Sequence, residues 1–377
     1  MSDADAAWRD PLAVATGWEA PVDPRMLRRR THGPFWDLLD EAGVTLLVTR
    51  EYEHLLLALA GAGGRGEVTH LCVPHPSGLA VDLDRRVVHL ASTRNPNVVL
   101  DLGPVSAEGW GEGPGPLVPL RTRTLPGRLY LHDLALIGGH LHANAVGRDS
   151  VVRLDDRGGH ERVWWPAVLD GHDGAFAVNH LQLNSIAAGR SLSSSYFTAS
   201  TDRPGHRRPG QRDFPVDGRG VVFSGRTRAP VARGLTRPHS ARLAPDGSLW
   251  VADSGYGRLT AVDVRRGDVE TVARLPGWTR GLALHGELAV IGTSRVLPRF
   301  HRYAPGLDPA ACVCGVHLVD RASGVVRASL TWPHGDQLFA VEVVPAGWCD
   351  GLPAGPGRGA ARRRALFYDL APTRGPQ

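Results

Sequence analysis

Short apolar segments separated by tight turns recur along most of the 377-residue chain, and this recurrence restricts the fold more than any other feature. Residues 240–275 show one unit clearly, because proline, aspartate, serine and glycine separate the segments "SARLA", "SLWVAD", "RLTAVD" and "VETVARL". These turn residues suit hairpins, and the segments have the length of strands. The unit is therefore predicted to be a four-stranded antiparallel sheet.

Five complete units of this kind and one split unit fill residues 34–350. Their spacing of about 40 to 60 residues is typical of propeller blades. The split unit combines "VTLLVT", "HLLLALA" and "EVTHLCV" near the start of the chain with "QLFAVEVV" at 337–344. The prediction is an all-β, six-bladed β-propeller of four-stranded antiparallel blades. A C-terminal strand joins the N-terminal blade and closes the ring, which removes exposed sheet edges.

Three segments lie outside this repeat. Residues 1–33 are predicted to be a loosely ordered N-terminal arm. A short helix is expected in "GPFWDLLDEAG", where Phe35, Leu38 and Leu39 recur at helical spacing. Residues 351–377, which include "GLPAGPGRGAARRR", are expected to form a flexible basic tail.

Composition excludes several classes of protein. All 43 basic residues are arginine, the net charge is +5, and the arginines are scattered, which argues against a nucleic-acid partner. No apolar stretch approaches a membrane span, and the N-terminus lacks a secretory pattern. Four cysteines make no secreted disulfide framework, so a cytoplasmic location is expected. The glycine-rich "GAGGRG" at 61–66 is a hairpin turn, so no nucleotide cofactor is predicted.

Polar residues gather where the first strand of each unit begins, and that end of every first strand faces the mouth of the central channel. Aligned on the six first strands, the residues at this mouth are Ser77, His132, Asn184, His239, Arg280 and Gln337. His75, His180, His334 and Gln182 directly precede such positions. The two longest insertions, at 201–218 and 294–312, are expected on the same face. Together these features predict a ligand site.

The predicted chemistry of this site follows from its imidazoles. His132 and His239, with His75, His180 or Asn184 as further ligands, could hold a divalent metal, and imidazole favours zinc, iron, manganese or copper over calcium. Arg280 would hold an anion, and a histidine without metal could act as general acid or base. Asn184, Gln337, Gln182 and Ser77 are predicted to contact the ligand. A site without metal keeps the same residues, and a single histidine at a strand start is more often structural than functional.

Four segments of the chain resemble the strand motifs of a bacterial family of conserved hypothetical propeller proteins. They are "LHDLA" (131–135), "LNSIA" (183–187), "PHSAR" (238–242) and "LPGWTRGLA" (275–283), and the likeness covers roughly residues 33–350. Many relatives have histidine where this chain has Gln182 and an acidic residue in place of Gln337, which puts a family-like metal site in doubt here. The resemblance implies the propeller fold without a reaction. The blades are also distantly similar to gluconolactonases, strictosidine-synthase-like proteins and peptide-amidating lyases.

The sequence therefore predicts a metal-assisted enzyme, namely a lyase, hydrolase or oxidative tailoring enzyme. Its substrate would be a small anionic molecule or a peptide bound at the channel mouth. His132, His239 and Arg280 are the expected catalytic residues. The alternative is a non-catalytic propeller whose polar face binds a protein partner, with only water in the channel.

Overall fold

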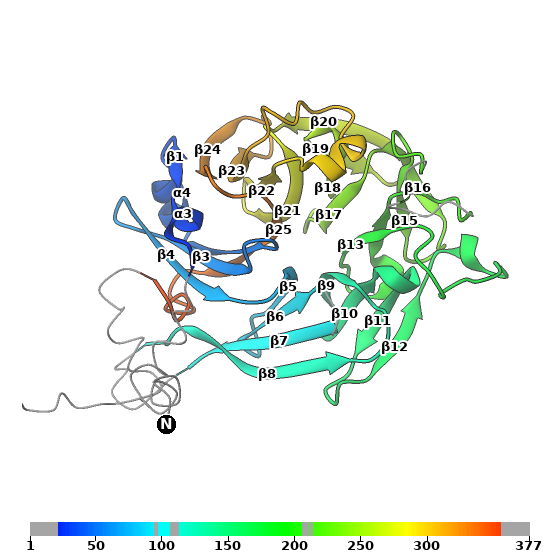
Figure 1. Ribbon diagram of the computed structural model, residues 1–377, viewed down its shortest axis with the longest axis horizontal. Coiled ribbons are helices and arrows are strands. Elements are labelled where there is room, and N and C mark those ends of the chain that lie inside the picture. Colours follow the sequence, from blue (N-terminus) through cyan, green and yellow to red (C-terminus); the bar gives the residue numbers. More distant parts are fainter. Residues whose placement is uncertain (1–21, 94–96, 106–112, 206–210, 212–213, 356–377) are drawn as a thin grey trace, which may run out of the picture.

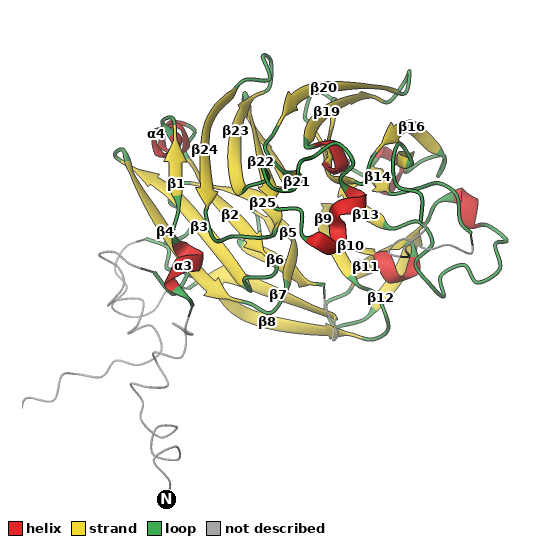
Figure 2. Ribbon diagram, turned by 45° about the horizontal axis from the view of Figure 1, so that its top comes forward, coloured by secondary structure: helices red, strands yellow, loops and turns green. Residues whose placement is uncertain are grey.

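Six antiparallel sheets surround one central axis in the computed structural model of the chain (Figure 1), which describes residues 22–93, 97–105, 113–205, 211 and 214–355. The first strands of neighbouring sheets contact one another around the axis, so they line the channel. Strands dominate the described chain, and the helices are short (Figure 2). The predicted six-bladed β-propeller is confirmed.

Each blade contains four consecutive strands of the ring. Blade 1 holds β25 (Leu338–Pro345), β2 (Val44–Arg50), β3 (Leu55–Ala62) and β4 (Arg65–Cys72). Blade 2 holds β5 (Pro76–Asp82), β6 (Val87–Ser92), β7 (Asn97–Pro104) and β8 (Leu117–Leu125). Blade 3 holds β9 (Leu131–Ile137), β10 (His140–Ala145), β11 (Ser150–Leu154) and β12 (His160–Trp164). Blade 4 holds β13 (Leu183–Ala187), β14 (Tyr196–Ala199), β15 (Gly220–Ser224) and β16 (Pro230–Leu235). Blade 5 holds β17 (Pro238–Leu243), β18 (Leu249–Asp253), β19 (Arg258–Asp263) and β20 (Asp268–Arg274). Blade 6 holds β21 (Trp278–His285), β22 (Leu288–Ser294), β23 (Cys314–Asp320) and β24 (Val326–Trp332).

The two ends of the propeller sequence meet in blade 1. Strand β25 pairs with β2 in a register that runs from Val44 opposite Pro345 to Arg50 opposite Leu338. Because β25 supplies the strand nearest the channel, the ring closes without a free inner edge, as predicted. Helix α4 (Phe35–Glu41) forms where the helix was expected, and it buries Phe35, Leu38 and Leu39 against blades 1 and 6.

The segments flanking the ring add contacts that the sequence did not predict. Helix α3 (Pro24–Leu27) and strand β1 (Arg30–His32) both lie in the segment expected to be an arm. Strand β1 pairs with β24 and gives blade 6 a fifth, outer strand. In the expected tail, Ala354 is buried and forms a β-bridge with His70. Residues 1–21 and 356–377 of the two predicted segments lie outside the described chain.

The hydrophobic core lies between the blades, since each blade packs its apolar faces on both neighbours. Between blades 1 and 2, for example, Leu47 and Leu56 pack with Leu79 and Leu90, all at most 1% exposed. This core between the blades holds the channel and its polar residues in place.

No helix in the described part of the chain has the length and apolar character needed to span a bilayer.

A β-bulge interrupts the first strand of every blade close to the channel mouth. The register between first and second strands shifts at Pro76/Leu79 in blade 2, Leu183/Ser185 in blade 4 and His239/Arg242 in blade 5, and equivalent shifts occur in the other three blades. A bulge leaves a residue unpaired and bends the strand, which redirects its side chains. These six bulges place the side chains at the channel mouth.

Hydrogen bonds near the bulges link all six neighbouring pairs of blades around the channel. In order from blade 1 to blade 6, the links are Thr49 Oγ1 to Ser77 O (2.8 Å), Ser77 Oγ to Leu131 O (3.1 Å), Ile186 N to Asp133 Oδ2 (3.0 Å), Ala241 N to Ser185 Oγ (2.9 Å), Gly281 N to Ser240 Oγ (2.8 Å) and Leu338 N to Ser294 Oγ (2.9 Å). The side chains in this ring satisfy backbone groups that the bulges remove from the sheets.

Candidate functional site

A pocket of about 90 Å³ lies at the channel mouth, where first strands of several blades begin. By this measure one water needs about 10–15 Å³, so the pocket suits a small ligand. Its lining includes five of the predicted site residues, namely His132, Gln182, His239, Arg280 and Gln337. The structure therefore brings these five residues, which are far apart in the sequence, to one cavity.

The imidazole of His239 is held in one tautomer. Its Nδ1 lies 2.8 Å from the carbonyl oxygen of Arg237 and 2.9 Å from the hydroxyl of Ser254. A carbonyl oxygen can only accept, so Nδ1 carries the proton and donates it to Arg237. The other nitrogen, Nε2, has no hydrogen-bond partner among the described residues and keeps its lone pair.

His239 is neutral at pH 7. Burial lowers the pKa of His239 well below its usual value, and the positive charges of Arg280 and Arg237 lower the pKa further. A neutral imidazole with a free Nε2 can accept a proton from a bound molecule. An anion bound beside the two arginines would offset their charge and make Nε2 more basic.

His132 lies in the same pocket and is held by aromatic side chains. Its ring meets the ring of Phe339 edge to face at 5.3 Å and lies 5.0 Å from Tyr130. Only 5% of His132 is exposed. His132 from blade 3 and His239 from blade 5 therefore line the same pocket.

Two buried arginines give the pocket its positive charge. The guanidinium of Arg280 lies over the Phe339 ring at 3.4 Å from its centroid, and that of Arg237 lies over Tyr303 at 4.6 Å. Burial lowers the pKa of both arginines, in the case of Arg237 to about 10, so both are charged at pH 7. Arg237 was not among the predicted residues, although it directly precedes the "PHSAR" motif.

The 294–312 insertion covers the pocket. Arg295, Val296 and Phe300 line the pocket from this insertion, and η6 (Pro298–Tyr303) brings Tyr303 onto Arg237. Phe214, from the 201–218 insertion, packs in a hydrophobic cluster with Trp278 and with residues of the 294–312 insertion. Both insertions therefore lie on the predicted face. Residues 206–210 and 212–213 of the 201–218 insertion lie outside the described chain.

Four predicted site residues do not line the pocket. Ser77 and Asn184 instead hold neighbouring blades together. Ser77 Oγ donates to the Leu131 carbonyl oxygen at 3.1 Å, and Asn184 Nδ2 donates to the Pro238 carbonyl oxygen at 2.9 Å. The ring of His75 packs edge to face on His54 at 4.4 Å. His180 similarly contacts His172, at 4.9 Å. His75 and His180 both precede the first strand of their blade and lie outside the pocket lining.

The residues at the pocket do not fit the predicted divalent metal. Of the four histidines expected to bind it, only His132 and His239 reach the pocket. Within the described chain, no group of three histidine, cysteine, aspartate or glutamate side chains is placed to hold a metal ion. Arg237 and Arg280 in the same space would repel a cation. The pocket is better suited to an anion.

Sequence reasoning also missed residues that lie beside the aligned first-strand positions or that follow a second strand. Glu51 and Tyr52 follow β2, Trp278 begins β21, and Phe339 is the second residue of β25. The carboxylate of Glu51 accepts a hydrogen bond from the Thr93 hydroxyl at 2.9 Å. A search of the residues that follow second strands could have found Glu51, because those residues also face the channel mouth.

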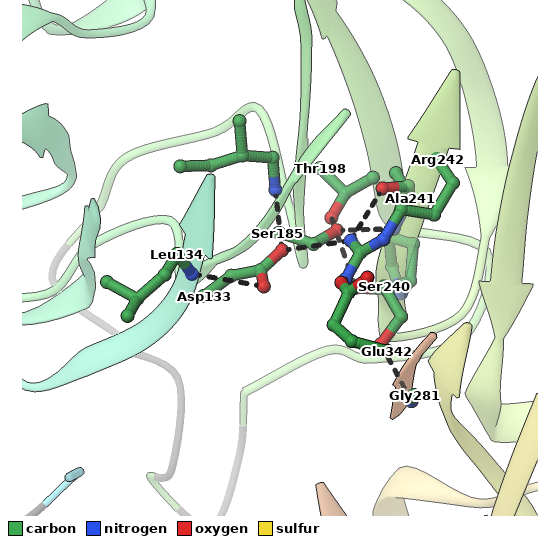
Figure 3. A network of polar contacts seen from close by, with 11 residues as sticks. Asp133, Leu134, Ser185, Thr198, Ser240, Ala241, Arg242, Gly281 and Glu342 are labelled. Carbon is green, nitrogen blue, oxygen red and sulfur yellow. Dashed lines mark hydrogen bonds and ion pairs between the residues drawn. The ribbon is translucent and has the colours of Figure 1, made fainter. Parts of the chain in front are cut away.

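Further along the same strands, an ion-pair network crosses the channel (Figure 3). Arg242 of β17 reaches Glu342 of β25 at 2.8 Å and Asp133 of β9 at 3.4 Å. Burial tends to lower the pKa of Arg242, but the two carboxylates raise it overall. The three residues come from every second blade, and each lies one to three positions beyond a pocket residue of its own strand.

Fold and pocket together define a six-bladed β-propeller with a buried, positively charged site at its channel mouth. The chain belongs to the family described as a domain of unknown function, DUF4915, whose profile matches residues 33–350. No curated protein sequence matches it. Among solved structures, a chain of the nidogen/laminin complex is similar, with a TM-score of 0.55 and 13% identity over 81% of this chain and 99% of that chain. A protein of unknown function from Bacteroides caccae has a TM-score of 0.53 and 9% identity, over 80% of this chain and 99% of that one. These likenesses show the fold alone.

Proposed function

We propose that the protein is an enzyme that binds a small anion at the channel mouth and transfers protons to or from it by histidine acid–base chemistry. One observation carries this proposal: two buried arginines, which have no carboxylate partner among the described residues, face the same small pocket as two histidines. A buried charge is costly unless it is paired, so an anionic ligand is the natural partner of these arginines.

The residues divide the work as follows. Arg237 and Arg280 hold the anion, since a guanidinium can donate two parallel hydrogen bonds to a carboxylate or phosphate. Nε2 of His239 accepts a proton, either from a carbon of the bound anion, as in a lyase, or from water, as in a hydrolase. His132 is placed to return a proton to the product. Such catalysis typically contributes about 10²- to 10⁴-fold to a rate.

The test combines binding and turnover with a panel of small carboxylates and phosphate esters. Thermal unfolding identifies the anions that stabilise the protein, and proton NMR in D₂O then follows their conversion or exchange. We expect Arg280→Gln to weaken binding about 10- to 100-fold, because a charged hydrogen bond contributes about 1.5–3 kcal/mol. His239→Gln should lower the rate by at least about 100-fold and the affinity much less.

The matched control is Arg153→Gln, since Arg153 lies in β11, forms an exposed ion pair with Glu161 and does not line the pocket. This variant should bind and convert the same anions as the wild type. Two results contradict the proposal: no anion of the panel stabilises the wild type, or His239→Gln converts the bound anion at the wild-type rate. The second result would show that His239 is not the base, whereas a wild type that binds an anion but neither converts it nor exchanges its protons would favour a binding protein over an enzyme.

A further inference from the structure

Arg237 and Arg280 are exceptions among the buried arginines of the described chain. Arg50 and Arg123, the other two arginines less than 10% exposed, each form an ion pair with a carboxylate, at 3.1 and 2.5 Å. Arg237 is 9% exposed and Arg280 is 8% exposed, and neither forms an ion pair with a described carboxylate. In the described chain, each buried arginine outside the pocket therefore has a carboxylate partner, and the two at the pocket have none.

The unpaired donors of Arg237 are buried as well. Its Nε and Nη1 atoms have no hydrogen-bond partner among the described residues. The face of its guanidinium is covered by Tyr303, as that of Arg280 is covered by Phe339. Stacking of this kind leaves only the edges of the guanidinium, where the N–H groups lie, available to a ligand. The N–H donors of both guanidinium groups therefore have no hydrogen-bond acceptor among the described residues.

The charges around the pocket do not balance. Among the described residues, three arginines, Arg237, Arg280 and Arg295, line it together with a single carboxylate, that of Glu51. Arg295, which is exposed, donates to the Pro333 carbonyl oxygen at 2.7 Å and forms no ion pair with a described carboxylate. His239 contributes no charge at pH 7 because burial and the two neighbouring arginines keep it neutral. The described part of the lining therefore carries two more positive charges than negative ones.

We infer that the natural ligand of this pocket is a compact dianion, with two negative charges that neutralise Arg237 and Arg280 together. This inference rests on the proposed anion site and specifies its substrate class. A small dicarboxylate and a phosphate monoester share this chemistry, and the pocket of about 90 Å³ limits either to a few heavy atoms. A monoanion would leave one buried arginine without a partner.

Isothermal titration at pH 7.5 with pairs of ligands that differ by one charge tests the inference. Succinate is compared with succinamate, which has nearly the same shape and one charge fewer. Methyl phosphate is compared with dimethyl phosphate in the same way, so the two arms distinguish a dicarboxylate from a phosphate ligand. We expect the dianion of at least one pair to bind 10-fold or more tightly than its monoanionic partner.

Variants connect that preference to the two arginines. Arg237→Gln and Arg280→Gln should each reduce the preference for the dianion to less than about 3-fold, whereas Arg153→Gln should preserve it. Both pocket variants should unfold at the wild-type temperature or above it without ligand, because they remove a buried charge that has no partner in the described chain. The titrations of the wild type need no variant and remain informative if a variant fails to fold.

The outcomes separate this inference from the proposed function. If the members of each pair bind the wild type with equal affinity, the dianion inference is wrong while the anion site stands. If none of the four ligands binds, and no other anion stabilises the protein, both fail. A preference for the dianion that survives in both arginine variants would also overturn the inference, because other residues would then recognise the second charge.

Discussion

His317 shows how a single buried side chain can make stability depend on pH. It lies in β23 and is 2% exposed. Its Nε2 is 2.9 Å from the Thr293 hydroxyl and its Nδ1 is 2.8 Å from the Ser329 hydroxyl. Burial lowers the pKa of His317 to about 4. The folded protein therefore keeps this imidazole neutral at pH values where the unfolded chain protonates it.

Acid should weaken the protein through His317. Between pH 6.5 and about 4 the unfolded state binds a proton at this residue and the folded state does not, so the free energy of unfolding falls as the pH falls. The full contribution is about 3 kcal/mol, at about 1.4 kcal/mol per pH unit. Urea unfolding of wild type and His317→Gln at pH 7.5, 6, 5 and 4 measures it. The variant should show the smaller loss in acid.

The comparison for His317→Gln is His140→Gln, because His140 is exposed and its imidazole contacts only the Gly138 carbonyl among the described residues. This control should follow the wild-type pH dependence. Parallel pH curves for wild type and His317→Gln would show that the unfolded and folded states protonate His317 alike in this range, and would contradict the prediction.

At the scale of the strand, the bulges explain three polar residues of the recurring motifs. Asp133, Ser185 and Ser240 each accept a backbone N–H from the first strand of the next blade. Asp133 and Ser240 directly follow the pocket residues His132 and His239, whereas Ser185 follows Asn184, which does not line the pocket. Two of the motifs thus combine a residue that faces the pocket with one that fixes the neighbouring bulge.

Removal of one such acceptor should destabilise the propeller. Ser240→Ala leaves the buried Gly281 N–H without the Ser240 hydroxyl, which now accepts it at 2.8 Å. A buried donor without a partner costs about 1–3 kcal/mol. The positive φ of 51° at Ser240 strains serine and alanine alike, so backbone strain should not change. Urea unfolding measures the loss, and exposed Ser193→Ala should lie within about 0.5 kcal/mol of wild type. An equal stability of both variants would show that the hydrogen bond contributes nothing net.

The sequence predicts strands far better than it predicts the direction of side chains at their ends. The blades, the ring closure and the helix at Phe35 follow from apolar periodicity and turn residues, which are local. Arg237 and Glu51 were missed because their direction depends on turns and on bulge geometry, which no periodicity encodes. The same cause misplaced His75 and His180, which precede the strands that bulge. Strand β1 was missed because its three residues are all exposed and show no apolar pattern.

At the scale of the whole molecule, the ion-pair network ties together blades that are not neighbours in the ring. Arg242, Asp133 and Glu342 belong to blades 5, 3 and 1, so one guanidinium spans the channel (Figure 3). Burial raises the pKa of both Asp133 and Glu342, and Arg242 opposes that rise. A buried ion pair adds little net stability compared with apolar packing, but an isolated buried charge is costly. Arg242 therefore stabilises the propeller chiefly by neutralising the two buried carboxylates.

Because an isolated buried charge is more costly than a buried ion pair, the network gives a prediction for the stability of the whole ring. Arg242→Met should lower the free energy of unfolding by about 3–5 kcal/mol at pH 7.5, because Asp133 and Glu342 then remain buried without a cation. The loss should shrink toward pH 5, since both carboxylates bind protons in the folded variant at higher pH than in the unfolded chain. Arg153→Met, which breaks an exposed pair, should cost at most about 1 kcal/mol.

A triple variant, Arg242→Met with Asp133→Asn and Glu342→Gln, separates charge from packing in this network. It removes all three charges, so most of the stability lost in Arg242→Met should return, as urea unfolding at pH 7.5 would show. The amide oxygen introduced by Asp133→Asn would still accept the Ile186 N–H that Asp133 accepts now at 3.0 Å, so the link between blades 3 and 4 is preserved. If the triple variant is no more stable than Arg242→Met, the packing of the Arg242 side chain, rather than the balance of charge across the channel, is what holds the three blades in register.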